Sequence, residues 1–297
     1  MLDFRIETFL TLCRVMNYTR TAQILNVTQP TVTQHIRYLE AEYDCKLFSY
    51  VGKTLLLTPS GEHLRDFARS MAYNSQRIQE RMRQSRGQKP VMRLGATKTV
   101  GEFVIGQMIS TYLRKNPECR LSLLVDNTDT LLKLLERGEL DFAVVEGFFD
   151  KSKYGHRLFK NETFIGVCAA EHSLADRMLT IDDIMAQNII VREPGSGTRA
   201  IFEQLLKQQN YSFDSLAQIT VVSDFSVIKR LVCDKIGIAF LYEPVVRAEL
   251  ASGVLKKLHL EAMQVQREFN YVFLKDTLFL EEWRAFFFDQ GDTEKLP

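Results

Sequence analysis

The stretch TQPTVTQHIRYLE, residues 28–40, decides the N-terminal fold. Thr28 can cap a helix with its side-chain oxygen, and Pro30 falls in the first turn, where a missing amide hydrogen does no harm. Apolar residues then recur at spacings of four, three and four, the periodicity of one face of an α-helix: Val32, Ile36, Leu39 and Tyr43. We therefore expect a helix with this face buried.

The opposite face of this helix is polar. It carries amides, hydroxyls and one guanidinium: Gln29, Thr31, Thr33, Gln34, Arg37 and Tyr38. Such groups at the N-terminal end of a helix suit base edges and phosphates in a major groove, where Gln pairs with adenine and Arg with guanine. An ordinary solvated face has a similar composition, so the face alone leaves both interpretations open.

The flanking sequence adds the rest of a winged helix-turn-helix. Residues 3–16 have helical periodicity, Asn17 can cap a helix over 18–25, and Asn26-Val27 makes a tight turn. Beyond the helix of residues 28–43, a hairpin is predicted to turn at 51–53, so that Lys53 meets phosphate or the minor groove. Thr19 and Arg20, in the first turn of the preceding helix, complete the expected DNA-binding residues.

The order of residues 28–40, followed by Lys46-Leu47-Phe48 and Leu57-Thr58-Pro59-Ser60-Gly61, resembles the N-terminal signature of LysR-type transcriptional regulators. The resemblance implies an operator of double-stranded DNA and, with it, a role in transcription regulation. Tyr50 stands where the family usually has an arginine, which removes one positive charge from the wing, whereas Lys53 stands where the family has a second basic residue.

Charge and composition agree with a DNA-binding module joined to another module. Residues 1–90 hold 13 Lys and Arg against 8 Asp and Glu, a net charge of +5, whereas residues 91–297 carry −4. No apolar run approaches the length of a membrane span, and the charged N-terminus is no signal peptide, so we expect a cytoplasmic protein without a membrane partner. The five cysteines are scattered, which favours core positions over a metal or redox site.

Residues 59–86 predict a long helix. Apolar residues approximate a seam at three-and-four spacing, interrupted by Asn74: Leu64, Phe67, Met71, Ile78 and Met82. Asn74 could fix the register of two copies, or the seam could pack on the helix-turn-helix of its own chain. The resemblance favours pairing, because family members use this helix for an antiparallel dimer and often assemble into tetramers.

Beyond a break at residues 85–90, short apolar runs alternate with helical segments, as expected for βα units around parallel sheets. The resemblance implies a two-lobed α/β effector domain of the periplasmic-binding-protein (type 2) kind. We expect a DNA-binding domain at 1–58, a linker helix at 59–90 and an effector domain at 91–297. Lobe one would comprise 91–161 and 267–297, and lobe two 162–266.

Two loops at helix starts predict the effector site. Unpaired amides and a positive helix dipole at each start favour a small anion. We expect Thr97, Lys98 and Thr99 to bind it in lobe one, and Gly195, Ser196, Gly197, Thr198 and Arg199 in lobe two, with Ser223 and Phe225 on the wall. An ordinary loop is the alternative for 195–198, and a structural role is the favoured interpretation of Glu146. The sequence Gly195-Ser196-Gly197-Thr198-Arg199 resembles that of family members that sense inorganic sulfur anions or phosphorylated metabolites.

The function predicted is a LysR-type regulator whose operator binding or DNA bending responds to a small anionic effector between the lobes. An enzyme is the main alternative on such a fold. The sequence has no nucleophile elbow, HExxH motif, dinucleotide-binding glycine string or Walker loop, so we expect no catalytic residues, cofactor or metal. A solute-binding protein is the other alternative, and it would need export.

Overall fold

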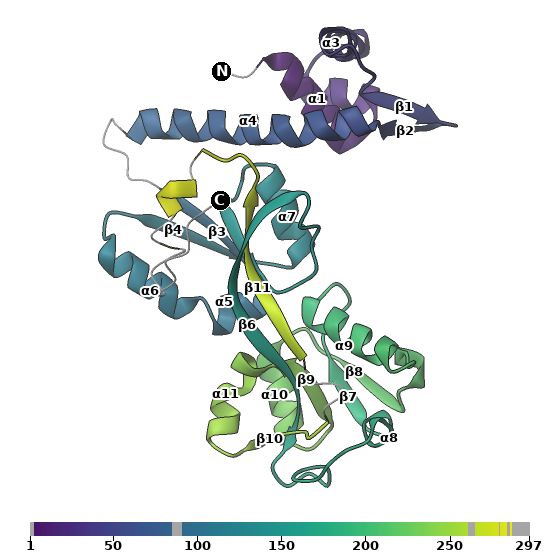
Figure 1. The fold of residues 1–297 in the computed structure, drawn as a ribbon, viewed down its shortest axis with the longest axis vertical. Helices are drawn as coiled ribbons and strands as arrows, with labels where there is room; N and C mark the ends of the chain where they lie inside the picture. The colour runs from purple at the N-terminus through teal and green to yellow at the C-terminus, as the bar shows by residue number, and fades with distance from the viewer. Residues whose placement is uncertain (1–2, 85–90, 261–264, 279, 284–285, 287–297) are drawn as a thin grey trace.

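We analysed a computed structural model that describes residues 3–84, 91–260, 265–278, 280–283 and 286. The N-terminal unit contains α1 (Phe4–Val15), α2 (Tyr18–Leu25) and α3 (Gln29–Glu42), followed by the hairpin β1 (Phe48–Val51) and β2 (Thr54–Leu57) (Figure 1). The strands pair Val51 with Thr54, and Gly52 between them has φ +61°, a conformation that favours glycine. The expected winged helix-turn-helix is therefore present.

Side-chain caps set the starts of these helices. The carboxylate of Asp3, the amide oxygen of Asn17 and the hydroxyl of Thr28 accept hydrogen bonds from the backbone amides of Arg5, Arg20 and Thr31. The core beneath contains Phe9, Leu12, Ile36 and Leu39, all at most 2% exposed. Tyr43, expected in the same stripe, is 49% exposed because it is the C-cap of α3, where the helical geometry has ended.

The long helix α4 (Pro59–Gln84) lies across lobe one of the same chain (Figure 1). Thr58 caps it by accepting from the amide of Gly61. Asn74 donates to the carbonyl of Asp276 and accepts from the amide of Leu278, so it faces lobe one and the interpretation that it interrupts a seam between two copies is wrong. The apolar residues on another face are exposed: Phe67, Met71, Ile78 and Met82.

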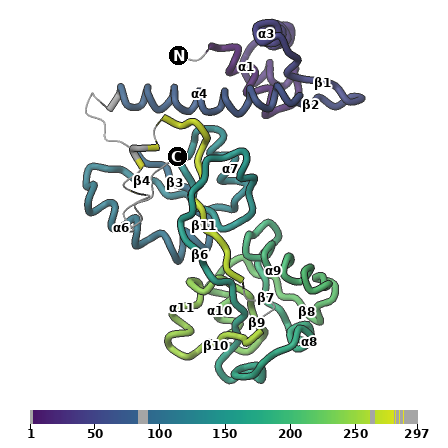
Figure 2. Tube along the Cα trace, in the orientation of Figure 1, coloured from purple at the N-terminus to yellow at the C-terminus, as the bar shows by residue number. Residues whose placement is uncertain are grey.

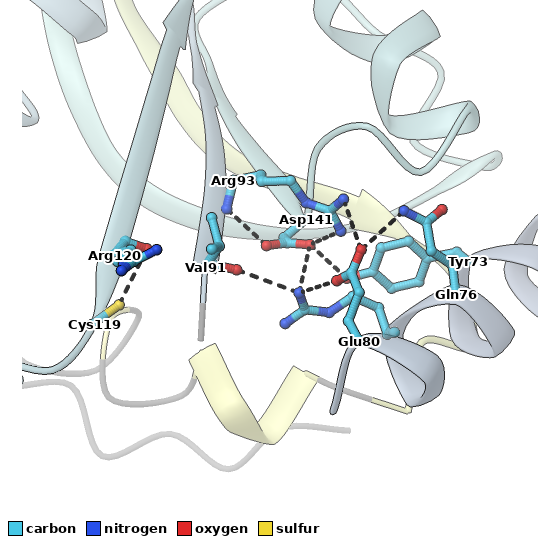
Figure 3. Close-up of polar contacts among 9 residues, drawn as sticks. Tyr73, Gln76, Glu80, Val91, Arg93, Cys119, Arg120 and Asp141 are labelled. Carbon is cyan, nitrogen blue, oxygen red and sulfur yellow. Dashed lines mark hydrogen bonds and ion pairs between the residues drawn. The ribbon is translucent and has the colours of Figure 1, made fainter. Parts of the chain in front are cut away.

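A buried polar cluster fixes α4 to lobe one; we call Tyr73, Arg77, Glu80, Arg93 and Asp141 the α4 cluster (Figure 3). The fully buried Asp141 carboxylate accepts from Tyr73 Oη at 3.0 Å and from the backbone N and guanidinium of Arg93 at 2.7 and 3.0 Å. The Arg77 guanidinium lies 3.7 Å from Asp141 and donates to Glu80 at 3.0 Å. Each carboxylate thus faces cationic donors, as buried charges require.

A mixed sheet runs through both lobes, in the strand order β4-β3-β5-β11-β6-β9-β7-β8, with β10 beside β6. Lobe one contributes the parallel strands β3 (Val91–Ala96), β4 (Arg120–Val125) and β5 (Phe142–Val145). Lobe two contributes the parallel strands β7 (Asn188–Val191), β8 (Gln218–Val221) and β9 (Ile238–Tyr242), and β10 spans Leu255–Lys257. The apolar runs predicted as strands coincide with these elements.

Helices pack around the strands of each lobe (Figure 1). In lobe one they are α5 (Lys98–Phe103), α6 (Gly106–Lys115) and α7 (Thr128–Glu136). In lobe two they are α8 (Ile181–Met185), α9 (Gly197–Gln208), α10 (Phe225–Cys233) and α11 (Glu243–Ala251). Short 3₁₀ turns span Phe213–Ser215 and Leu280–Trp283. None of the helices within the described ranges combines the length and apolar character of a bilayer crossing.

Two long antiparallel strands connect the lobes, β6 (Tyr154–Ala169) and β11 (Val265–Leu274) (Figure 2). Both reach α4 at their lobe-one ends. Tyr154 Oη donates to Glu136, which also pairs with Arg69 of α4 at 2.9 Å, and the carbonyl of Lys275 accepts from Ser70 at 2.6 Å. The end of β11 is therefore tied to α4 by the residue that follows it, and β6 is tied to α4 indirectly through Glu136 of α7.

Candidate DNA interface and interlobe cleft

The polar face of α3 is open to solvent. Gln29, Gln34 and Arg37 are exposed, and so are Thr28 and Pro30 at its start. Thr31 and Thr33 are partly exposed because they bond locally: the Thr31 and Thr28 hydroxyls lie 2.8 Å apart, and Gln29 Nε2 donates to Thr33 Oγ1 at 3.0 Å. Residues at the N-terminal half of a helix projecting in this way match the docking geometry of a recognition helix.

The wing and the start of α2 border the same surface. A hollow of about 280 Å³ lies between α2, α3 and the wing, lined in part by Thr19, Gln29, Tyr50 and Lys53. Three predicted DNA-binding residues from separate elements are thus neighbours here. Arg20 is exposed beyond the hollow. Tyr38 is 47% exposed, as the sequence indicates, with the Arg5 guanidinium 3.8 Å from its ring.

A second site lies between the lobes; we call it the cleft. It has a volume of about 280 Å³, and its lining comes from both lobes: Thr97, Lys98, Val125, Asp126, Asn127, Thr128, Glu146, Arg192, Glu193, Ser196 and Gly197. A neighbouring hollow of about 430 Å³ shares Thr128, Ser196 and Gly197 and is also lined by Gly195 and Arg199. The cleft is of the size of a small metabolite.

Helix starts point at the cleft from both lobes. Thr97 and Ser196 occupy the N-cap positions of α5 and α9, but neither side chain makes a capping hydrogen bond. Gly195 before α9 has φ +87°, which favours glycine. The first-turn amides of α9, a helix of 12 residues, are therefore available to a ligand acceptor.

The cations of the cleft are already engaged. The Arg192 guanidinium, 3% exposed, makes two hydrogen bonds to Glu193, at 2.7 and 2.8 Å, and packs 4.3 Å over the Phe225 ring. Pairing with Arg192 lowers the pKa of Glu193, although partial burial opposes this. Lys98 Nζ donates to the carbonyl of Ser223 at 2.6 Å, a bond that joins the two lobes.

Several buried polar atoms beside the cleft have no hydrogen-bond partner among the described residues. They are the hydroxyls of Thr97, Thr99, Thr198 and Tyr242 and the Oε2 atom of Glu146. Burial raises the pKa of Glu146 to about 7, and the nearby Thr99 hydroxyl and the Arg192 charge oppose this only partly. Buried polar groups normally have partners, so this concentration makes the cleft a candidate binding site.

The predicted effector residues divide into three groups. Thr97, Lys98, Ser196 and Gly197 line the cleft, and Gly195 and Arg199 line the neighbouring hollow. Thr99 and Thr198 are buried behind the lining, Phe225 is covered by Arg192, and Ser223 is joined to Lys98 through its carbonyl. Five further lining residues were not predicted as part of the site: Asp126, Asn127, Thr128, Arg192 and Glu193.

Two sequence profiles match this chain. The profile for the bacterial regulatory helix-turn-helix protein, lysR family, matches residues 5–62, and that for the LysR substrate binding domain matches residues 85–287. The chain belongs to the LysR family. It is a DNA-binding transcription regulator with an effector-binding domain, as the N-terminal signature predicted.

Relatives of this LysR-family regulator are similar over nearly their whole length. The transcriptional regulator CysL of Bacillus subtilis is 24% identical over 90% of this chain and 89% of its own. CbbR of Rhodospirillum rubrum is 27% identical over 92% and 89%. Full-length LysG of Corynebacterium glutamicum, solved with bound effector Arg, shares the fold with a TM-score of 0.65 at 15% identity, covering 97% of each chain. The relatives are named as transcription regulators, which agrees with the expectation of a non-enzyme.

Proposed function

We propose that this LysR-type regulator reads operator DNA with the exposed face of α3, and that a small anion in the cleft modulates this binding. The observation that carries the first part is the exposure of Gln29, Gln34 and Arg37 beside Lys53 of the wing. We propose the division into domains at 1–58, 59–90 and 91–297, with lobe one at 91–161 and 267–297 and lobe two at 162–266, and a location in the cytoplasm.

The DNA proposal is tested with Thr33→Ala, Gln34→Ala and Arg37→Ala. Each lost base contact should weaken operator binding by about 1–3 kcal/mol, roughly 5- to 150-fold, because a bidentate contact discriminates bases by that amount. Arg247→Ala is the matched control, because it removes an exposed arginine from α11 in lobe two. Unchanged affinity and sequence preference in all three variants, measured by fluorescence anisotropy, would contradict the proposed recognition helix.

The anion proposal rests on the unpartnered hydroxyls and the start of α9 that border the cleft. Small carboxylates and phosphate should raise the melting temperature of the full chain, because a ligand that binds only the folded state stabilises it. Stabilisation by cations or neutral apolar compounds alone would contradict an anion site. The bound effector Arg of LysG supports a small-molecule effector for this chain but neither its position nor its chemical identity.

We also propose that α4 pairs with a second copy of the chain. The supporting observation is the exposed apolar row at positions 67, 71, 78 and 82, on a face not used to contact lobe one. Phe67→Glu combined with Ile78→Glu should lower the mass measured by light scattering to that of a monomer or, from a tetramer, to a dimer. Asp129→Lys, an exposed change on α7, serves as the control and should leave the mass unchanged.

A further inference from the structure

Glu146 directly follows β5 and lines the cleft. It is 4% exposed, lines the cavity, and has an Oε2 atom without a hydrogen-bond partner among the described residues. A carboxylate that is both buried and unpartnered is costly, because neither water nor the protein satisfies its oxygen. The nearby Thr99 hydroxyl does not bond this Oε2 atom, and a donor on a ligand in the cleft would satisfy it.

The neighbouring charges do not provide that donor. Arg192 already makes two hydrogen bonds to Glu193, and Lys98 donates to Ser223 across the lobes. The charged lining holds three carboxylates against two cations: Asp126, Glu146 and Glu193 against Lys98 and Arg192. An anion without an N–H or O–H group would place its oxygens against the unpartnered oxygen of Glu146 and would be repelled.

The acceptor and the start of α9 are close neighbours. A Cβ placed on Gly197, the first residue of α9, would lie 3.6 Å from both Cγ and the carbonyl oxygen of Glu146. The free amides at the start of α9 and the Glu146 carboxylate are thus within reach of two adjacent groups of one small molecule. Such a ligand has an anionic group for the amides and a donor next to it for Glu146.

We propose that the effector is an anion with an adjacent hydrogen-bond donor, an α-hydroxy or α-amino carboxylate, and that Glu146 rejects anions lacking that donor. This inference rests on the proposed anion site in the cleft. When Glu146 is ionised, it disfavours sulfate and other fully deprotonated inorganic sulfur anions, one of the two anion classes that the family resemblance had suggested. Glu146 is then a specificity-determining residue, because it distinguishes ligands that share a negative charge.

The protonation of Glu146 gives the inference a pH signature. Burial raises the pKa of Glu146 to about 7, so near pH 6 the neutral acid can itself donate to an anion without a donor. At pH 8 the ionised form cannot. Arg192 and Tyr242 are the charged or titratable groups that interact with Glu146, and Lys98, Asp126 and Glu193 line the same cleft; none of the five is a histidine.

The test uses two sets of ligands, and within each set the members differ in the group next to the carboxylate, which is hydrogen, hydroxyl or ammonium. The first set is succinate, L-malate and L-aspartate. The second is propionate, L-lactate and L-alanine. Dissociation constants are measured by calorimetry on the full chain at pH 6 and pH 8. At pH 8, a donor-bearing member of at least one set should bind about tenfold more tightly than its donor-free counterpart. From pH 6 to pH 8, the donor-free anions should lose about tenfold in affinity, because each pH unit above the pKa lowers the protonated fraction about tenfold.

Glu146→Gln should remove both effects, since its amide is uncharged and can donate at either pH. Glu102→Gln, an exposed carboxylate of α5 outside the cleft lining, is the matched control and should keep both. Whether hydroxy or amino acids bind better identifies the donor, and a larger loss of the amino acids in Glu146→Gln would indicate an ammonium.

Two results would overturn the inference in different ways. If anions bind but donor-bearing and donor-free members do not differ in the wild type at pH 8, the role of Glu146 is wrong while the anion site stands. If none of the six compounds or phosphate binds up to about 50 mM, the proposed anion site fails and the inference with it. Should Glu146→Gln not fold, the pH dependence of the wild type alone decides, because it needs no variant.

Discussion

The α4 cluster and the cleft are both buried and polar, yet the hydrogen bonding of the buried carboxylate in each differs. In the α4 cluster, the fully buried Asp141 carboxylate is bonded to Tyr73 and Arg93 and lies near Arg77. In the cleft, Glu146 and the nearby Thr97, Thr99 and Thr198 hydroxyls are as deeply buried, but each has a polar atom without a partner among the described residues. The first arrangement holds two parts of one chain together, whereas the second is the one that we propose a ligand completes.

Breaking the α4 cluster should have the largest effect. Asp141→Ala leaves the Arg77 and Arg93 guanidiniums without their buried counter-charge, which should lower the free energy of unfolding by about 3–5 kcal/mol. Urea denaturation measures the loss. Glu102→Ala, at an exposed site, should change it by no more than about 0.5 kcal/mol, and a similarly small change for Asp141→Ala would show that the cluster is not stabilising.

Removing the charge of Glu146 from the cleft should raise the free energy of unfolding instead of lowering it. Because the folded-state pKa of Glu146 is about 7 against an ordinary value of 4.5, the wild type loses stability as the pH rises between these values. Glu146→Gln lacks this loss, so it should be more stable than the wild type by up to about 3 kcal/mol at pH 8 and by almost nothing at pH 4.5. If the stability difference between the wild type and Glu146→Gln does not change with pH, Glu146 is not a buried carboxylate without a partner.

The smallest effect should come from a pair of hydroxyl deletions. Tyr73→Phe removes a hydrogen bond to a buried carboxylate and should cost about 1.5–3 kcal/mol of unfolding free energy. Thr198→Val removes a buried hydroxyl that has no partner, so stability should stay within about 1 kcal/mol or rise. Equal losses of unfolding free energy in the two variants, measured by thermal unfolding, would contradict the proposed difference in hydrogen bonding between the α4 cluster and the cleft.

Local sequence predicted the DNA-binding unit well, because its elements are fixed by near neighbours. The caps Asp3, Asn17 and Thr28 act within three residues of themselves, and Gly52 turns the wing between paired strands. Tyr43 was misjudged because periodicity does not show where a helix ends. Where contacts between near neighbours fix an element, the structure agrees with the prediction from the sequence.

The cleft and α4 were predicted less completely, because their contacts join distant residues. Asn74 bonds to residues 276 and 278, more than 200 positions away, which no helical pattern reveals. Glu146 was interpreted as structural because a lone carboxylate at a strand end usually is. Only the approach of Gly197 and Arg192 from lobe two shows that it borders the ligand site.

The length of β6 has a mechanical consequence. Sixteen residues at about 3.3 Å each make a strand of roughly 50 Å, which starts at Tyr154, hydrogen-bonded to Glu136, and ends deep in lobe two. Its pairing with β11 shifts register at Phe159, close to the boundary between the lobes, and β9 and β10 pair with it only beyond that point. If a metabolite draws the lobes together, as proposed, this strand would carry the resulting torque towards the helix that bears the DNA-reading heads.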